Sequence, residues 1–228
     1  MPKAASVSAD VPNNAPRSPK GERTRTRLLE AAKKVFEEDG FLEARITDIS
    51  KRAKLSHGSF YHYFESKEQI FRELAEAQEA RLTAPPDGGR LATSPDDAPR
   101  KRIRKANRRY LERYRDEARI MGVIEQVSRY DVHVNAARMA SQKHFAERSE
   151  RAIRRLQSQG LADARVDAAI AADALGAMVA RFAELWLVQG YREYDFDEAV
   201  EQLTILWGNA LGLKGERTTL QRRGGKRR

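Results

Sequence analysis

Apolar residues recur along this chain at the spacing of helices, and nowhere with the alternation that is typical of strands. The first helix is expected to be about 18 residues long and to start near Glu22. Gly40 is expected to end it in a left-handed conformation, with Phe41 packing back onto it. The apolar face of this helix consists of Leu28, Ala32, Val35 and Phe36. The pattern predicts an all-α fold.

Three further helices are expected before the first break in the pattern. Thr47 is the predicted N-cap of a second helix, and Ser56 that of a short third helix that ends at Phe64. Ser66 begins a fourth helix, which runs to about Leu82.

A stretch rich in Pro, Gly and Asp, at about 83–99, is expected to be a flexible loop. The helical pattern then resumes up to residue 213. The expected segments are 100–130, as one or two helices, then 133–159, 166–189 and 196–213. The last two are apolar over wide faces, so they need cover on more than one side.

The segment 46–67 has the layout of a helix-turn-helix, because two short helices are separated by about three residues. On a helical wheel Phe60 and Phe64 lie about 40° apart, which turns both rings toward the core. The opposite arc is small, hydrogen-bonding or aromatic, and it consists of Gly58, Ser59, Tyr61 and His62. Gly58 costs a helix about 1 kcal/mol relative to Ala, which makes sense if the backbone must approach another surface closely. This arc is typical of a helix that faces DNA.

An ordered set of positions extends this motif over some fifty residues, from about Arg23 to Ala75. The set consists of Leu28-Leu29-Glu30-Ala31-Ala32, Phe36, Gly40-Phe41, Thr47-Asp48-Ile49, Ser56, Gly58, Ser59, Tyr61, Phe64, Ser66 and Lys67. It resembles the N-terminal domain of TetR/AcrR-type transcriptional regulators. The departures from the common family pattern are Lys54, Ser59, Phe60 and Tyr63. Lys54 stands where the family often has a turn glycine, so a small left-handed backbone penalty is expected there.

The resemblance implies DNA contacts for particular residues. Phosphate contacts fall on Thr47, Tyr61, Tyr63 and Lys67. Contacts to bases or their immediate backbone fall on His57, Gly58, Ser59 and His62. The free N–H groups near Ser56 are also able to meet a phosphate. As an alternative, Tyr61 and Tyr63 pack between the first and third helices.

The resemblance also implies the organisation of the chain. The expected parts are a disordered arm at 1–20, the helix-turn-helix domain at 21–66, a helical ligand-binding and dimerisation domain at 67–213, and a basic disordered tail at 214–228. In the family the last two helices form a four-helix bundle with a second copy. The expected dimer interface is Met178, Leu203, Leu206, Trp207 and Ala210; a plain intrachain core is the alternative.

A small-molecule effector is expected in the C-terminal half. Methionine adapts to irregular shapes and aromatic rings supply large apolar faces, so the candidates predict an apolar or amphipathic ligand. They are Met121, Met139, Phe145, Met178, Phe182 and Trp186. The alternative is that each of these residues is an ordinary core residue that binds no ligand.

The formal net charge is +10, and it is unevenly distributed. Residues 21–80 hold 11 basic and 12 acidic residues, whereas 100–115 hold 9 against one and 214–228 hold 7 against one. As an alternative, the run at 100–115 is a solvated helix face and the run at 214–228 is a disordered end. Cysteine is absent, and there is neither an apolar signal core at the N-terminus nor a run of about 20 apolar residues. A cytoplasmic protein is expected.

No catalytic motif, phosphate-binding loop or metal-ligand set is apparent, so neither an enzyme nor a cofactor is expected. The predicted function is a sequence-specific transcriptional regulator, a repressor that an effector releases from a near-palindromic double-stranded operator. The alternative is a DNA-binding adaptor or nucleoid-associated protein that responds to no ligand.

Overall fold

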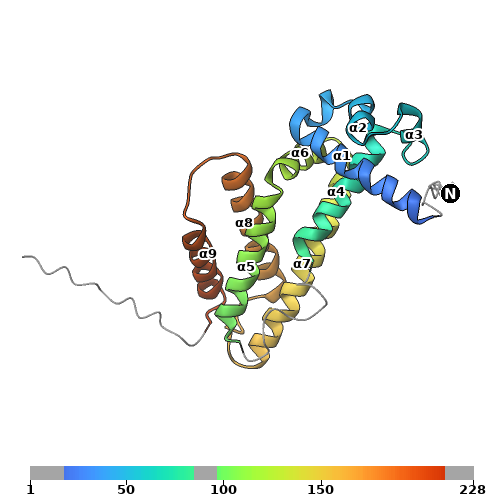
Figure 1. Cartoon of the computed structure of the whole chain (residues 1–228). Helices are drawn as coiled ribbons and strands as arrows, with labels where there is room; N and C mark the ends of the chain where they lie inside the picture. The colour runs from blue at the N-terminus through green and yellow to red at the C-terminus, as the bar shows by residue number, and fades with distance from the viewer. Residues whose placement is uncertain (1–17, 85–96, 214–228) are drawn as a thin grey trace, which may run out of the picture. The chain divides into compact units, whose positions relative to one another are not determined.

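The computed structural model describes residues 18–84 and 97–213, and these residues form helices without any strand (Figure 1). The all-α prediction is confirmed. The described residues separate into two compact units: the first comprises those up to Glu79 together with Arg119–Arg138, and the second comprises Ala80–Ala118 and those from Met139 onward. Most of the predicted arm, most of the predicted loop at 83–99 and the predicted tail lie outside the described residues.

The first unit is built on four helices, in which α1 packs on α2 and α2 on α3 (Figure 1). They are α1 (Pro19–Glu43), α2 (Ile46–Arg52), α3 (His57–Tyr61) and α4 (Lys67–Thr83). Its core is aromatic: the rings of Phe36 and Phe71 meet edge to face with centroids 4.9 Å apart, and Phe41 stacks on Phe36 at 5.9 Å. Phe41 thus packs back onto α1, as the sequence predicted.

Helix α1 differs from its prediction at both ends. It starts earlier than Glu22, because the side-chain oxygen of Ser18 accepts a hydrogen bond from the backbone N–H of Gly21 at 3.2 Å. Gly40 interrupts the helix with φ +73° and ψ 176°, which is not the left-handed helical cap conformation, and the chain makes a further turn to Glu43. The expected interruption at Gly40 and its positive φ are therefore confirmed, whereas the expected left-handed helical cap conformation is wrong.

The predicted cap of α3 at Ser56 and the predicted start of α4 at Ser66 are both confirmed. Ser56 accepts from the backbone N–H of Ser59 at 3.2 Å, and Ser66 accepts from that of Gln69 at 3.1 Å. The predicted cap at Thr47 is wrong, because the N-cap of α2 is Arg45, whose backbone carbonyl accepts the first hydrogen bonds of the helix without help from a side chain. Helix α3 ends at Tyr61, short of Phe64.

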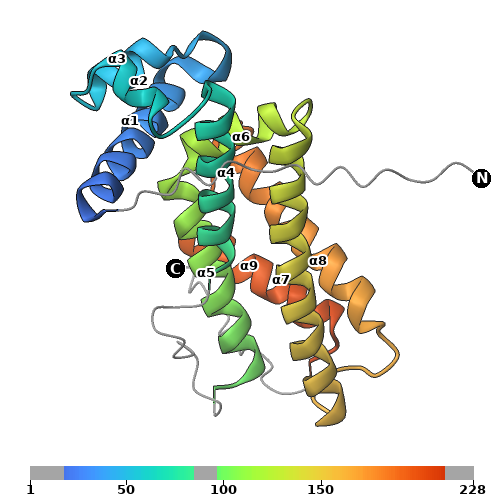
Figure 2. The same cartoon turned by 90° about the vertical axis from the view of Figure 1, so that its right-hand side faces the viewer.

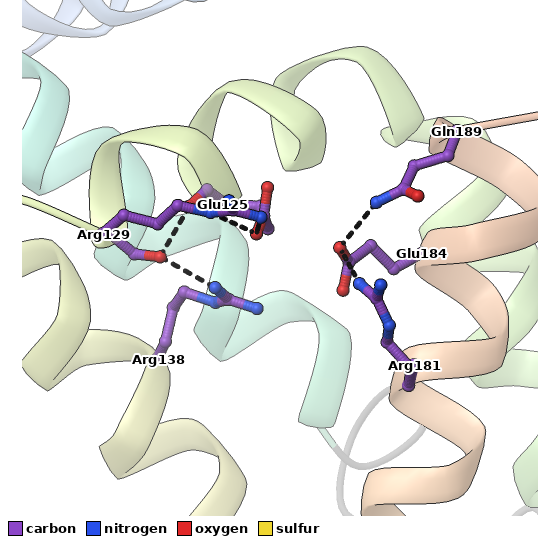
Figure 3. Close-up of polar contacts among 7 residues, drawn as sticks. Glu125, Arg129, Arg138, Arg181, Glu184 and Gln189 are labelled. Atoms are coloured by element: carbon purple, nitrogen blue, oxygen red, sulfur yellow. Dashed lines mark hydrogen bonds and ion pairs between the residues drawn. The ribbon is translucent and has the colours of Figure 1, made fainter.

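Two more helices contribute to the first unit, α6 (Ala118–Ser128) and the start of α7 (Val132–Ser158). The turn between them carries Asp131, whose carboxylate accepts from the backbone N–H groups of His133 and Val134. The same carboxylate forms an ion pair with Arg72 of α4 at 2.8 Å. Arg138 donates to the hydroxyl of Ser128 at 2.8 Å, which joins the start of α7 to the end of α6 (Figure 3).

The second unit is organised around α5 (Pro99–Asp116), which packs against α8 (Ala168–Ala183) and α9 (Phe196–Ala210) (Figure 2). The predicted segment 100–130 therefore forms two helices, one of the two outcomes expected. Helix α7 ends before Gly160, which has φ +68°, at the predicted place.

The predicted helix at 166–189 changes from an α-helix to a π-helix near its end. It begins after Asp167, whose side chain accepts from the backbone N–H of Ile170 at 2.9 Å, and its last turn is the π-helix η2 (Glu184–Val188). Glu184 is buried, and its carboxylate accepts hydrogen bonds from Arg181 and from Gln189, the latter at 3.0 Å (Figure 3). Buried charge requires such partners, so η2 depends on them.

Two leucines of α1 allow a matched test of this core. Leu28 is fully buried, whereas Leu42 is 76% exposed. Leu28→Ala is expected to lower the free energy of unfolding by about 2–5 kcal/mol, because it leaves a cavity, and Leu42→Ala by less than about 1 kcal/mol. Urea unfolding of the two variants without DNA measures this; equal losses would contradict the described packing of α1.

Candidate nucleic-acid interface

The inner face of α3 is fixed by two aromatic rings. Phe60 and Phe64 are fully buried and their ring centroids are 5.7 Å apart. The guanidinium carbon of Arg25, on α1, lies 4.9 Å from the centre of the Phe64 ring, a cation–π contact. Ser56 closes the first turn through its hydroxyl, which lies 2.7 Å from that of Ser59. The short helix is therefore held from the inside and at its start.

The outer face of α3 is exposed, as the helical wheel predicted. His57, Gly58 and His62 are exposed, and Tyr61 keeps 48% of its surface accessible. The rings of His57 and Tyr61 meet edge to face with centroids 5.3 Å apart. Tyr61 therefore lies on the surface and not between α1 and α3, whereas Tyr63 and Ser59 are half-buried.

Gly58 has no internal reason to be a glycine. A methyl group built on it would meet no atom of the described chain within 4 Å, and its φ is not positive. Helices favour Ala over Gly by about 1 kcal/mol. The chain thus keeps a destabilising residue on the exposed face of α3.

Exposed cations lie at both ends of α2, and Thr47 in its first turn is itself exposed. Arg45, Lys51 and Lys54 are exposed and form no ion pair with any residue among 18–84 and 97–213. Lys54 has φ +53°, so the left-handed conformation expected there is confirmed. The sequence analysis missed Arg45 and Lys51; the available signal was that Lys51 lies one turn after Thr47 and shares its helix face.

Arg52, the next cation of α2, is already neutralised within the chain. Its guanidinium donates to both carboxylate oxygens of Glu38, at 2.7 and 2.5 Å. This hydrogen bonding lowers the pKa of Glu38 below its ordinary value. Arg52 is therefore less available to an outside anion than its neighbours.

Lys67 has a structural role that the sequence did not show. Its ammonium donates to the backbone carbonyls of Phe41 at 2.8 Å and Leu42 at 3.0 Å, and it lies 4.8 Å from the centre of the Phe41 ring. These contacts fasten the end of α1 to the start of α4. An ammonium has three N–H donors, so one remains for a phosphate.

The predicted effector residues are distributed over both units. Met121 is buried in the first unit. In the second unit Met139 is 48% exposed, and the half-buried candidates are Phe145, Met178, Phe182 and Trp186. The structure brings two of the candidates together, because the rings of Phe182 and Trp186 are 5.6 Å apart; Tyr194, which the sequence analysis did not name, contacts both rings at 5.3 and 5.7 Å.

The predicted dimer residues divide into two groups. Leu203 and Trp207 are 3% and 6% exposed within the single chain, so they belong to its own core. Leu206 is 49% exposed, Ala210 is exposed and Met178 is half-buried. Of the predicted dimer residues, Leu206 and Ala210 are thus the two that the single chain leaves exposed.

Residues 28–74 match the family model of bacterial regulatory proteins of the tetR family. The chain carries a tetR-family DNA-binding domain. This domain is the helix-turn-helix described above, with α1, α2, α3 and the first turns of α4. No helix among the described residues is both long and apolar enough to cross a membrane, and none of the His, Asp and Glu side chains at 18–84 and 97–213 gather into a metal-binding group.

The sequence matches to HTH-type transcriptional regulators are short. The chain is 49% identical over 55 residues to the uncharacterised HTH-type transcriptional regulator YdgC of Bacillus subtilis, covering 24% of this chain and 28% of that protein. It is 43% identical over 60 residues to the HTH-type transcriptional repressor NicS of Pseudomonas putida, covering 26% of this chain and 28% of that protein. The matched part therefore spans little more than a quarter of these relatives.

Structural similarity extends well beyond the tetR-family domain. The fatty acid degradation regulator FadR of Bacillus halodurans aligns with a TM-score of 0.67 over 89% of this chain and 99% of that one, at 17% sequence identity. At this identity the comparison shows a shared fold. The predicted fold class, with an N-terminal helix-turn-helix and a C-terminal helical domain, is confirmed.

Because no atom of the described chain lies within 4 Å of a methyl group built on Gly58, the exposure of this position can be tested by unfolding the protein without DNA. Gly58→Ala is expected to raise the free energy of unfolding by up to about 1 kcal/mol, because Ala is the better helix former and its methyl group meets nothing. Urea unfolding in the absence of DNA measures the change. A destabilised variant would show that this position is packed inside the chain and that the face is not open.

Proposed function

We propose that the protein is a sequence-specific DNA-binding transcriptional regulator that works as a homodimer on a near-palindromic operator. It acts as a repressor, and a small apolar or amphipathic effector releases it. The observation that carries this proposal is the exposed face of α3, held over buried Phe60 and Phe64 in a tetR-family helix-turn-helix.

The exposed face has the chemistry to read base edges. Ser59 and His62 offer small or planar hydrogen-bonding groups that suit the major groove. Gly58 lets the backbone approach closely, and His57 extends the face at its start. Phosphate contacts fall to Thr47, Tyr61, Tyr63 and Lys67, with Ser56 at the helix start. Of the cations that the structure adds, Arg45 and Lys51 flank Thr47 and strengthen the phosphate-binding surface.

Dimerisation is supported by apolar side chains that the single chain leaves uncovered. Ile170 on α8 is 70% exposed and Leu206 on α9 is 49% exposed. Ala174 and Ala210 are exposed on the same two helices. One helix-turn-helix contacts few bases, so useful affinity requires two of them on a two-fold site.

The proposal also includes repression and the release of the protein from DNA by an effector. NicS, a relative in the DNA-binding domain, is a repressor by name. The half-buried rings of Phe182 and Trp186, with Tyr194, offer an apolar surface to an effector in the second unit. An effector that weakens operator binding ~100-fold must favour the unbound geometry by about 2.7 kcal/mol. Helices α4 and α7 each belong partly to both units, so they are elements through which such coupling can pass.

A ligand-independent DNA-binding adaptor is the second candidate, because basic residues at 100–115 and 214–228 would give non-specific phosphate affinity. The two candidates differ in their discrimination between sequences. A regulator favours its operator over random DNA by about 10³-fold or more, and an adaptor does not.

The reading role of α3 is tested on a duplex selected by the protein from a random pool. Ser59→Ala and His62→Ala are expected to lose about 1–3 kcal/mol of discrimination at particular base pairs, because each removes a base contact. Thr26→Ala serves as the control, since this exposed hydroxyl on α1 donates to its own helix. Fluorescence anisotropy on matched and mismatched duplexes gives the result. Unchanged preference in both α3 variants would contradict the assignment.

The dimer is tested at the exposed leucine of α9. Leu206→Glu is expected to convert a dimer into a monomer and to abolish tight operator binding, because it introduces a charge into an apolar interface. Leu42→Glu is the matched control, an exposed leucine outside α8 and α9. Sedimentation at micromolar concentration distinguishes the two. A wild-type protein that is monomeric and still binds its operator at full affinity would overturn this part.

A further inference from the structure

Four of the nine basic residues at 100–115 form ion pairs inside the second unit. Asp97 forms ion pairs with Lys101 and Lys105, and these partners lower the pKa of Asp97 to about 2. Acidic residues of α9 form ion pairs with Arg104 and Arg108. The sequence alone left open whether this run is a solvated face; these pairs show that much of it serves to join α5 to its neighbours.

Two other arginines converge on the backbone at the end of α4. Arg113 of α5 donates from one nitrogen to the carbonyls of Arg81 at 2.8 Å and Ala84 at 2.7 Å. Arg148 of α7 donates to the carbonyl of Thr83 at 2.7 Å. The C-terminal carbonyls of a helix attract cations, which explains the position of both side chains. Carbonyls carry no full charge, however, and neither guanidinium forms an ion pair with an acidic residue among 18–84 and 97–213.

Arg109 adds a third guanidinium to this place. It lies one turn before Arg113 on α5, is half-buried, and has no hydrogen bond or ion pair within the part of the chain that the structure describes. Burial and the charges of Arg113 and Arg148 lower the pKa of Arg109; burial, Arg113 and Arg151 lower that of Arg148. Arginine stays protonated in proteins, so these shifts express the cost of burying the charge and, after it, the proximity of like charges.

We propose that Arg109, Arg113 and Arg148 form a binding site for an oxyanion, a phosphate or carboxylate group carried by a small molecule. Guanidinium groups bind both kinds of oxyanion through paired N–H donors, and a half-buried location strengthens such bonds. The carboxylate of Glu117, four residues after Arg113, forms an ion pair with Arg81 at 3.5 Å.

An apolar surface adjoins the three arginines. The guanidinium carbon of Arg148 lies 5.6 Å from the centre of the Phe145 ring. That ring approaches Gly176 on α8 so closely that a methyl group there would lie 3.2 Å from it. The site therefore suits an amphipathic anion, with its charged group on the arginines and its apolar part toward Phe145. This assignment rests on the effector role proposed above and narrows the effector to an anion.

The test uses the full chain and two probes, inorganic pyrophosphate and sodium decanoate. Isothermal titration calorimetry in chloride buffer of constant ionic strength gives their affinities without DNA. Arg109→Gln is expected to weaken binding about tenfold or more, because it removes charge-assisted hydrogen bonds. Arg104→Gln is the matched control, since it removes the same charge from the same helix, and it is expected to change affinity less than about twofold.

The stability of the unliganded variant is a second measurement. Arg109→Gln is expected to leave the thermal midpoint unchanged or raise it, because it removes a charge that repels two others. Binding of pyrophosphate assigns the site to a phosphate group, and binding of decanoate to a carboxylate. The proposal is overturned if neither probe binds the wild type at millimolar concentration. It is also overturned if Arg104→Gln weakens binding as much as Arg109→Gln, which would indicate diffuse attraction to a basic surface.

One further variant tests for an internal counter-ion. Asp87 follows Ala84 by three residues in the sequence. If Asp87→Asn binds pyrophosphate while the wild type does not, the arginines serve that aspartate and the proposal fails. Because the titration is performed without DNA, it tests the oxyanion site independently of operator binding. An anion that binds without changing operator affinity would leave the site in place and remove only its effector role.

Discussion

The burial of Phe60 and Phe64 is the constraint on which the DNA-binding face depends. Helix α3 has only 5 residues, too few for a helix to be stable by itself in water. It keeps one orientation because both rings are fully buried and because Ser56 caps its first turn. A reading surface must be positioned within a fraction of an ångström, so the specificity of the outer face derives from the packing of the inner one.

The connections around α3 extend this rigidity. Lys67 fastens α4 to the end of α1, and Arg72 of α4 is paired with Asp131 in the turn between α6 and α7. Both pairings join segments that are distant in the sequence, within the first unit. A change at the α6–α7 turn is therefore transmitted to α4 by a direct ion pair and to the helix-turn-helix by the chain itself. This chain of contacts gives the proposed effector response a physical route up to α3.

The features that depend on local periodicity and residue type were predicted from the sequence. The helical spacing of apolar positions placed the helices, and the side-chain caps at Ser56 and Ser66 followed from residue type. The prediction was wrong at Thr47 because backbone hydrogen bonds to Arg45 began α2 earlier without a side-chain cap. Gly40 interrupts α1 as predicted, but a glycine signals only an unusual φ and not that the chain forms a further helical turn afterwards.

Properties that depend on distant partners were beyond the sequence pattern. Leu203, Leu206 and Trp207 form one apolar pattern on α9, yet only the packing of α5 and α8 decides that Leu206 is the exposed member. The basic run at 100–115 looked uniform, but four of its nine cations form ion pairs, whereas Arg109 and Arg113 have no acidic partner among the described residues. The π-turn at Glu184 had no signal that distinguishes it from an ordinary helix end.

Amide hydrogen exchange with and without a duplex selected by the protein tests the central claim most directly. If α3 is the reading head, DNA protects residues 45–63, with the largest protection in 56–62, because these amides become covered by the major groove. Protection of 100–115 or 214–228 without protection of 56–62 would contradict the account. It would assign DNA binding to the basic runs and make the exposed face of α3 a surface with another purpose.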